Sequence, residues 1–261
     1  MINSDTALSG KKVWVTRPAQ QSAELCRMIK ERKGTPLNLP TMIIRPVPQK
    51  VFTAEDTRRL TDADIVIFIS KNAVLHSRDL FPRIVAVLQE KTVLATGRAT
   101  AGCLLALGLE RVECIDAGGS EALLNLPALT AMEVRDKRVL IIRGQGGREE
   151  LRDRLLARAA GVDYLEVYRR EKPDISQADM ANFWHDETPD ALIITSLTGL
   201  DNLIELTPAA ESKRLYGTAM VVMSERIKQH ALEAGFVCIT VATDNSDAGL
   251  VDALLNMNEA G

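Results

Sequence analysis

This chain contains an internal sequence repeat. Landmark residues recur at a constant separation of 126 positions, namely Arg17 with Arg143, Asp64 with Asp190, and Ser70 with Ser196. Farther along, Arg98 matches Arg226 at a slightly larger separation, as one short loop insertion would produce. A duplicated unit predicts two similar domains, and the cleft between two domains is a common place for small molecules to bind.

Each copy alternates short apolar runs with stretches of helical period. The runs are rich in Val and Ile, which is typical of a parallel β-sheet covered by helices on both faces. Strands are expected near 12–17, 64–70, 92–96, 112–116, 138–143, 191–196, 218–223 and 237–242. Helices are expected at 20–32, 99–106, 148–159 and 226–234, with C-terminal caps at Gly34, Gly108, Gly161 and Gly235.

Composition narrows the class of protein. A length of 261 residues suits one large domain or two ordinary ones, and the repeat favours two. The net charge of −3 disfavours nonspecific binding to nucleic acid or membranes, which would need a broad basic face. The polar stretch 1–12 lacks the apolar core of a signal peptide and no apolar run approaches a membrane span, so we expect a cytoplasmic protein. The four Cys and three His are scattered, which gives no support to a metal site.

Small polar or glycine residues close several predicted strands just before a helix. They occur in Ser70-Lys71-Asn72, Thr96-Gly97-Arg98-Ala99-Thr100, Thr195-Ser196 and Ser224-Glu225-Arg226. Backbone N–H groups at a helix start donate hydrogen bonds to anionic oxygens, and ligands of open α/β sheets bind outside the carboxyl ends of the strands. Simple N-capping explains each residue taken singly. Taken together, the series favours a site for an anionic small molecule.

Two further features are open to more than one interpretation. The run Gly144-Gln145-Gly146-Gly147 opens a helix, but Glu149 stands where a dinucleotide fingerprint needs glycine, so we expect a flexible turn that carries arginines toward the cleft. Tyr168 lies beside two arginines in an extended segment. Its phenol either packs against neighbours or points into the cleft as a proton donor.

Taken together, these stretches resemble the uroporphyrinogen-III synthase family over nearly the whole chain. The resemblance rests on Val15-Thr16-Arg17-Pro18, Phe68-Ile69-Ser70-Lys71-Asn72-Ala73, Gly97-Arg98-Ala99-Thr100-Ala101, Arg143-Gly144-Gln145-Gly146-Gly147-Arg148, Val167-Tyr168-Arg169-Arg170, Thr195-Ser196 and Ser224-Glu225-Arg226-Ile227. It implies an α/β fold with two flavodoxin-like domains, parallel sheets and a two-stranded β connector that the chain crosses twice. Domain one would be 1–35 plus 174–261, domain two 49–161, and the connector strands 36–48 and 162–173. Two contiguous halves are the alternative.

The resemblance also implies an activity. The expected reaction is a lyase step of porphyrin and heme biosynthesis that closes the linear tetrapyrrole hydroxymethylbilane to uroporphyrinogen III. Water is lost and ring D is inverted through a spiro intermediate. Tyr168 is the expected catalytic residue. Substrate binding is expected at Thr16, Arg17, Ser70, Lys71, Asn72, Gly97, Thr100, Arg143, Gly144, Thr195, Ser196, Ser224, Glu225 and Arg226, with no metal and no cofactor.

The expected partner is the small-molecule substrate, bound by a monomer that touches the preceding pathway enzyme only transiently, with neither nucleic acid nor membrane as partner. Two other functions fit the same repeat. A two-lobed binding or sensor protein would hold its ligand without changing it, and a nucleotide-dependent oxidoreductase would use the turn 144–147.

Overall fold

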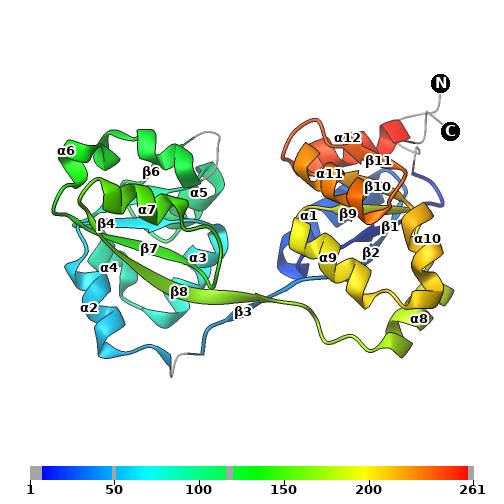
Figure 1. Ribbon diagram of the computed structural model, residues 1–261, viewed down its shortest axis with the longest axis horizontal. Helices are drawn as coiled ribbons and strands as arrows, with labels where there is room; N and C mark the ends of the chain where they lie inside the picture. Colours follow the sequence, from blue (N-terminus) through cyan, green and yellow to red (C-terminus); the bar gives the residue numbers. More distant parts are fainter. Residues whose placement is uncertain (1–7, 49–50, 116–119, 258–261) are drawn as a thin grey trace. The chain divides into compact units, whose positions relative to one another are not determined.

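The structure is a computed structural model that describes residues 8–48, 51–115 and 120–257 (Figure 1). The chain divides into two compact units. Unit 1 comprises 1–43 and 171–261, and unit 2 comprises 44–170. The chain therefore passes from one unit to the other at two places.

Unit 1 is built on a five-stranded sheet with the order β11-β10-β9-β1-β2. Its strands are β1 (Lys12–Val15), β2 (Thr35–Asn38), β9 (Ala191–Ile194), β10 (Ala219–Val222) and β11 (Ile239–Val241), and all their pairings are parallel. Its helices are α1 (Ala19–Glu31), α8 (Gln177–Asp186), α9 (Leu197–Leu206), α10 (Ser212–Gly217), α11 (Glu225–Ala234) and α12 (Asp247–Met257), with a 3-10 turn η5 (Ala209–Glu211). Counted in chain order, the strands follow the flavodoxin-like order 2-1-3-4-5.

Unit 2 contains a six-stranded sheet with the order β3-β8-β7-β4-β5-β6. Its strands are β3 (Ile43–Pro46), β4 (Ile65–Phe68), β5 (Thr92–Ala95), β6 (Glu113–Cys114), β7 (Arg138–Gly144) and β8 (Gly161–Glu171), and β4 to β8 pair in parallel. Its helices are α2 (Ala54–Asp62), α3 (Lys71–Leu80), α4 (Ile84–Leu88), α5 (Arg98–Ala106), α6 (Ala131–Val134) and α7 (Glu150–Ala157), with 3-10 turns η3 (Ser120–Asn125) and η4 (Pro127–Leu129). The order β8-β7-β4-β5-β6 repeats that of unit 1, with β3 added at the edge.

The two copies of the repeat exchange strands between the units. The Asp64 carboxylate accepts the backbone N–H of Arg138 at 2.8 Å, and its repeat mate Asp190 accepts the N–H of Lys12 at 2.7 Å. Each aspartate thus fixes the start of a neighbouring strand that comes from the other copy. Two contiguous halves are excluded by this pairing, because each sheet takes β1-β2 or β7-β8 from one copy and three strands from the other.

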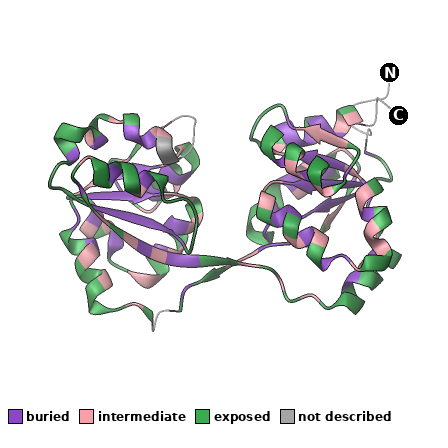
Figure 2. Cartoon of the chain, in the orientation of Figure 1, coloured by how far each residue is buried: buried purple, intermediate pink, exposed green. Residues whose placement is uncertain are grey.

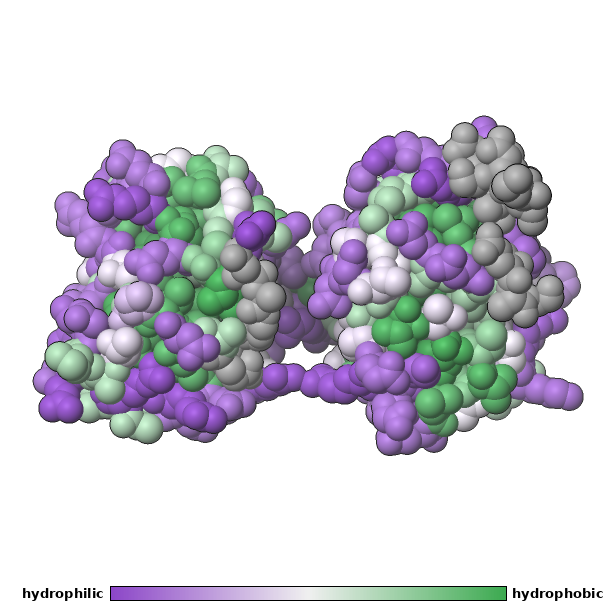
Figure 3. All heavy atoms as spheres, turned by 90° about the horizontal axis from the view of Figure 1, so that it is seen from above, coloured by the Kyte–Doolittle hydropathy of each residue, from purple (hydrophilic) through white to green (hydrophobic). Residues whose placement is uncertain are grey.

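Each sheet is buried on both faces (Figure 2). In β4, Val66 and Phe68 belong to one hydrophobic cluster, whereas Ile65 and Ile67 belong to the cluster on the opposite face. This explains why the strand sequences are continuous apolar runs. Large apolar side chains that stay exposed are scattered, and Figure 3 shows hydrophilic and hydrophobic residues intermixed on the face seen there.

The expected fold class is confirmed, and the two expected connector segments contain neighbouring strands, because β3 lies within 36–48 and pairs with β8, which includes most of 162–173. The segment 36–48 is not one strand, because Thr35–Asn38 pairs with β1 in unit 1 and Ile43–Pro46 pairs with β8 in unit 2. Most of the segment 162–173 belongs to β8, which pairs with β7 from Gly161 and ends at Glu171.

Two of the expected glycine caps are also wrong. Gly108 and Gly235 take left-handed backbone conformations after α5 and α11, as expected. After α1 the left-handed residue is instead Lys33, which precedes Gly34. After α7 it is Ala159, which precedes Ala160 and the start of β8. Gly34 has a different reason to be glycine, since a Cβ there would lie 2.8 Å from the Ile29 side chain.

Candidate functional site

Tyr168 is the centre of a polar cluster in unit 2. Its side chain is 0% exposed and packs in the core cluster that includes Phe68 and Val74. Of the two interpretations of Tyr168, the structure agrees with a ring that packs against its neighbours. The hydroxyl has two partners, Ser70 Oγ at 3.0 Å and the Arg170 guanidinium, which donates to it at 3.0 Å. The guanidinium carbon also lies 5.3 Å from the centre of the tyrosine ring.

A β-bulge gives Tyr168 its direction. The register between β7 and β8 jumps from Arg143 opposite Glu166 to Gly144 opposite Tyr168. In a regular strand, Val167 and Tyr168 would point to opposite faces, but both lie in the same core cluster here. Bulges turn side chains in this way and are common beside active sites. The bulge thereby directs the Tyr168 hydroxyl toward Ser70, the residue that caps α3 just after the carboxyl end of β4.

Gly144 is required by the same packing. A Cβ at this position would lie 2.5 Å from Cε2 and 2.6 Å from Cζ of Tyr168. The tyrosine ring therefore rests directly on the Gly144 backbone. Gly144 was predicted to bind substrate, and the structure gives it a different task, which is to make room for the ring.

Ser70 links the phenol to the start of α3. Its Oγ accepts the Ala73 N–H at 3.1 Å, so it is an N-cap, and it is only partly buried. Next to it, Lys71 is exposed and Asn72 is partly buried. No hydrogen bond or ion pair of Lys71 is found within the described ranges. The Lys71 ammonium is therefore available to an anionic group near the end of β4.

Arg143 is occupied by its own loop. Only 2% of it is exposed, and its guanidinium donates to the carbonyls of Gly144 at 3.2 Å and Gly146, and to the Glu149 carboxylate at 3.0 Å. It also stacks on Tyr164, 4.4 Å from the ring centre. The predicted flexible turn that presents Arg143 to a ligand is therefore wrong, because the arginine ties the turn down.

Glu149 and Tyr164 complete this loop. The Tyr164 hydroxyl donates to Glu149 at 2.6 Å. That bond, together with the nearby arginines, lowers the pKa of Glu149, while burial and the same carboxylate raise the pKa of Tyr164 to about 12. A charged carboxylate at the start of α7 disfavours a pyrophosphate there. The arrangement gives no support to a dinucleotide function.

The end of β5 offers a second helix start. Gly97 is the N-cap of α5, and no atom lies within 4 Å of where its Cβ would be. Thr96 is partly exposed and its N–H bonds the Phe68 carbonyl at 3.1 Å, which places β4 and β5 side by side at this edge. Thr100 is only 6% exposed, on the buried face of α5. A bulky residue at this position would disturb the core of unit 2.

In unit 1, Thr16 and Arg17 are committed to the fold. Thr16 is 4% exposed and donates to the Ile193 carbonyl at 2.8 Å. Arg17 forms an ion pair with Asp247 at the start of α12. Arg17 and its repeat mate Arg143 thus both pair with a carboxylate of their own unit. Both guanidinium groups therefore already have a carboxylate partner.

The adjacent ends of β9 and β10 keep several polar groups together. Ser196 caps α9 by accepting the Gly199 N–H at 3.0 Å, and the partly buried Ser224 precedes α11 without capping it through its side chain. The Met223 N–H bonds the Ile194 carbonyl at 3.1 Å, so these two strand ends are neighbours. Thr195, which lies between Ile194 and Ser196 in sequence, is partly exposed.

The first turn of α11 adds charge to this edge. Glu225 is exposed and pairs with Lys228 at 3.8 Å. Arg226 is exposed, and within the described part of the chain no partner is found for its guanidinium. The predicted residues that remain available to an anion are therefore Lys71 in unit 2, and Thr195, Ser224 and Arg226 in unit 1.

Sequence reasoning missed Arg170 and His76. The His76 ring, which comes from α3, lies 5.8 Å from the Tyr168 ring. Burial lowers the pKa of His76, and nearby Asp79 opposes that shift. The adjacency of Arg170 to Tyr168 in sequence was a usable signal, because residues two apart on a strand share a face. His76 gave no such signal.

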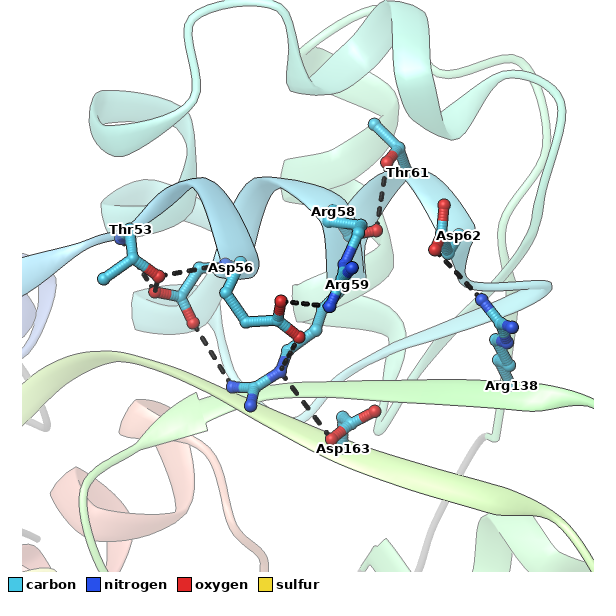
Figure 4. A network of polar contacts seen from close by, with 9 residues as sticks. Thr53, Asp56, Arg58, Arg59, Thr61, Asp62, Arg138 and Asp163 are labelled. Atoms are coloured by element: carbon cyan, nitrogen blue, oxygen red, sulfur yellow. Dashed lines mark hydrogen bonds and ion pairs between the residues drawn. The ribbon is translucent and has the colours of Figure 1, made fainter.

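A separate cavity of about 330 Å³ opens at the amino ends of β4 and β7. Arg58, Arg59 and Arg138 line it, but each is paired with a carboxylate, including Asp62 and Asp163 (Figure 4). Its charges are thus matched internally. Ligands of open α/β sheets bind at the opposite edge.

Within residues 8–48, 51–115 and 120–257, no cluster of His, Cys, Asp or Glu is arranged to hold a metal ion. Among the helices so described, none has the length and apolar character needed to cross a membrane.

The fold and the polar strand ends define a class, namely proteins with two α/β units of flavodoxin-like order and polar residues at the carboxyl ends of their strands. The family model for uroporphyrinogen-III synthase HemD matches residues 23–252. The chain is 32% identical over 252 residues to uroporphyrinogen-III synthase of Escherichia coli (strain K12), covering 93% of this chain and 98% of that protein. It is 32% identical over 253 residues to the Salmonella typhimurium enzyme, with the same coverage.

The chain therefore belongs to the uroporphyrinogen-III synthase family, which confirms the resemblance seen in the sequence. Solved structures agree on the fold. Uroporphyrinogen-III synthetase from Helicobacter pylori 26695 aligns with a TM-score of 0.66 at 15% identity, covering 95% of this chain and 99% of that one. A mutant uroporphyrinogen III synthase from the extremely thermophilic bacterium Thermus thermophilus aligns with a TM-score of 0.63 at 16% identity, covering 97% and 100%.

Proposed function

We propose that this protein is a uroporphyrinogen-III synthase, a lyase that cyclises hydroxymethylbilane with loss of water and inversion of ring D. The observation that carries the proposal is the Tyr168 hydroxyl held between Ser70 and Arg170 at the carboxyl edge of a parallel sheet. The protein would act in the cytoplasm as a monomer without a cofactor, in at most transient contact with the enzyme that supplies the substrate.

The substrate is a flexible chain that carries eight carboxylates. Its hydroxyl departs readily and leaves an electrophilic azafulvene, which ring D attacks through its substituted carbon to give a spiro intermediate. Fragmentation and reclosure then invert the ring. Such a reaction needs chiefly control of geometry, because holding reacting groups in place removes much of the barrier. This agrees with a site that has no strong nucleophile.

Two sets of groups support substrate binding. Lys71 and Arg226 supply exposed cations, and the starts of α3, α5, α9 and α11 supply backbone N–H groups, which favour anions. Local groups of this kind explain how a protein with a net charge of −3 holds an octacarboxylate. Tyr168 is the proposed source of the proton that leaves with the hydroxyl.

The test is the Tyr168→Phe variant with freshly generated hydroxymethylbilane. Phenylalanine keeps the buried ring and removes the proton, so isomer III formation should slow about 10- to 100-fold, the lower range for general acid catalysis, because this leaving group departs readily. The products are oxidised and the isomers separated by chromatography. A variant that forms isomer III at the wild-type rate would show that the hydroxyl is dispensable. Isomer I at an unchanged rate of substrate loss would show that Tyr168 steers ring D instead.

A further inference from the structure

We propose that Tyr168 does not touch the substrate, and that Ser70 relays its proton to the departing hydroxyl. The proposal rests on the function given above and deepens it. Tyr168 is 0% exposed, whereas Ser70 is partly exposed and its Oγ lies 3.0 Å from the phenol oxygen. A fully buried phenol cannot reach a substrate atom, but a serine hydroxyl in contact with it can.

The surroundings of Ser70 fit such a relay. Ser70 is the N-cap of α3 at the carboxyl end of β4, the edge at which ligands of open α/β sheets bind. Its Oγ accepts the Ala73 N–H, and that bond uses one lone pair and leaves the hydroxyl proton free to point outward. Either oxygen can donate across the 3.0 Å contact with Tyr168, and in the relay the second lone pair of Ser70 Oγ accepts the Tyr168 hydroxyl. Ser70 is thus placed to donate on one side while it accepts on the other.

Arg170, an exposed residue, supplies the second polar contact of the phenol oxygen. Its guanidinium donates to the phenol oxygen at 3.0 Å and lies 5.3 Å from the ring centre. A fixed positive charge at this distance stabilises the negative charge that develops on the phenol oxygen as its proton moves away. Arg170 is therefore a positioning residue, because it acts through Tyr168 and not on the substrate.

The proton balance of the step is closed. Ser70 gives its proton to the substrate hydroxyl, the C–O bond breaks, and the oxygen leaves as water with the bonding electrons. Ser70 Oγ takes the Tyr168 proton, and the phenolate is left beside Arg170. When the macrocycle closes, the pyrrole carbon that forms the last bond loses its proton, which returns to Tyr168 through Ser70. One water is released and neither an oxidant nor a reductant is needed.

The relay is tested with Ser70→Gly in the full chain. Glycine is nearly as good an N-cap as serine, so the start of α3 is kept while the hydroxyl is lost. Isomer III formation should slow about 10- to 100-fold, as for Tyr168→Phe. Ser70→Thr restores a hydroxyl and should recover most of the rate. Wild-type rates for Ser70→Gly would overturn the relay.

The double variant separates a relay from two independent contributions. If Ser70 and Tyr168 act in series, Ser70→Gly/Tyr168→Phe should be no slower than the slower single variant, because either change alone interrupts the same path. A combined loss near the product of the two single losses would contradict the relay. A solvent deuterium isotope effect on the wild-type rate should also disappear in both single variants, and its persistence in Ser70→Gly counts against the proposal.

A matched control removes a cap without removing the relay. Ser176 caps α8 by accepting the Asp179 N–H at 3.1 Å, and it is not among the strand-end residues. Ser176→Ala should lower thermal stability and leave the rate of isomer III formation unchanged. The failure of the relay and that of the proposed function are distinguishable. Wild-type protein that forms no isomer III refutes the function, whereas active wild type with an active Ser70→Gly variant refutes only the relay.

Discussion

Gly144→Ala is expected to displace Tyr168. An added Cβ would lie 2.5 Å from Cε2 and 3.0 Å from Cδ2 of the ring, whereas carbon atoms in contact prefer about 3.5–4.0 Å. The ring must therefore move by about 1 Å. Tyr168 is completely buried, so the space for that movement has to be taken from the core around it.

The cost follows from two terms. Overpacking a well-packed core by one methyl costs about 1–3 kcal/mol. A shift of about 1 Å also lengthens the 3.0 Å hydrogen bonds from Tyr168 to Ser70 and Arg170 beyond the usual limit, at about 0.5–1.5 kcal/mol each. We expect a total loss of about 2–6 kcal/mol and a fall in melting temperature of about 4–24 °C.

The assay is calorimetry or thermal circular dichroism, together with the rate of isomer III formation. The displaced phenol should lower that rate at least about tenfold, like Tyr168→Phe. Gly102→Ala is the control, because Gly102 lies in α5 with no atom within 4 Å of its added Cβ. It should stabilise the protein by about 0.5–1 kcal/mol through helix propensity and leave the rate unchanged.

A double-mutant cycle tests the cause. If the clash is with the Tyr168 ring, Gly144→Ala should cost much less in a Tyr168→Leu background, because leucine lacks the atoms that Cβ would meet. Equal costs in both backgrounds would refute the reasoning. Wild-type stability and rate for Gly144→Ala alone would refute it as well.

Two further predictions concern the buried Arg143 and the half-buried His76. Arg143→Ala should lower the free energy of urea unfolding by about 1.5–3 kcal/mol, because the charged hydrogen bonds of Arg143 hold the loop 144–149. Replacing the exposed Arg154 by Ala should lower it by less than about 1 kcal/mol, and equal losses in the two variants would contradict the prediction. The pKa of His76, followed by NMR, should lie below the ordinary value of about 6.5. The unfolded chain then binds the proton more readily, so stability falls as pH drops below about 6.5, and His76→Gln should flatten that fall; an unchanged slope would argue against it.

The strands could be predicted from the sequence because strands that are buried on both faces consist of continuous runs of Val, Ile and Leu. All eight expected strand segments contain a strand in the structure. The exchange of strands between the units was implied by the family resemblance but not by the local sequence, since Asp64 and Asp190 carry the same signal whichever copy they contact. Only the tertiary pairing decides between contiguous and exchanged halves.

The polar site was predictable in residue type and less so in role. Ser70 and Tyr168 are brought together, but 98 residues separate them and a β-bulge aims the phenol, which no local pattern announces. Arg17 and Arg143 were expected to bind substrate. Both are neutralised by carboxylates of their own unit, Asp247 and Glu149, whose positions depend on how the loops fold back.

Inversion of ring D during closure of the macrocycle distinguishes the proposed synthase from a protein that only binds its ligand. The measurement adds the wild-type protein to freshly generated hydroxymethylbilane and separates the oxidised products by chromatography. Without protein the substrate closes to isomer I, which serves as the internal reference. We expect isomer III to predominate and its share to rise with protein concentration. An isomer ratio identical to that of the protein-free reaction, at every concentration of correctly folded protein, would contradict the proposed function.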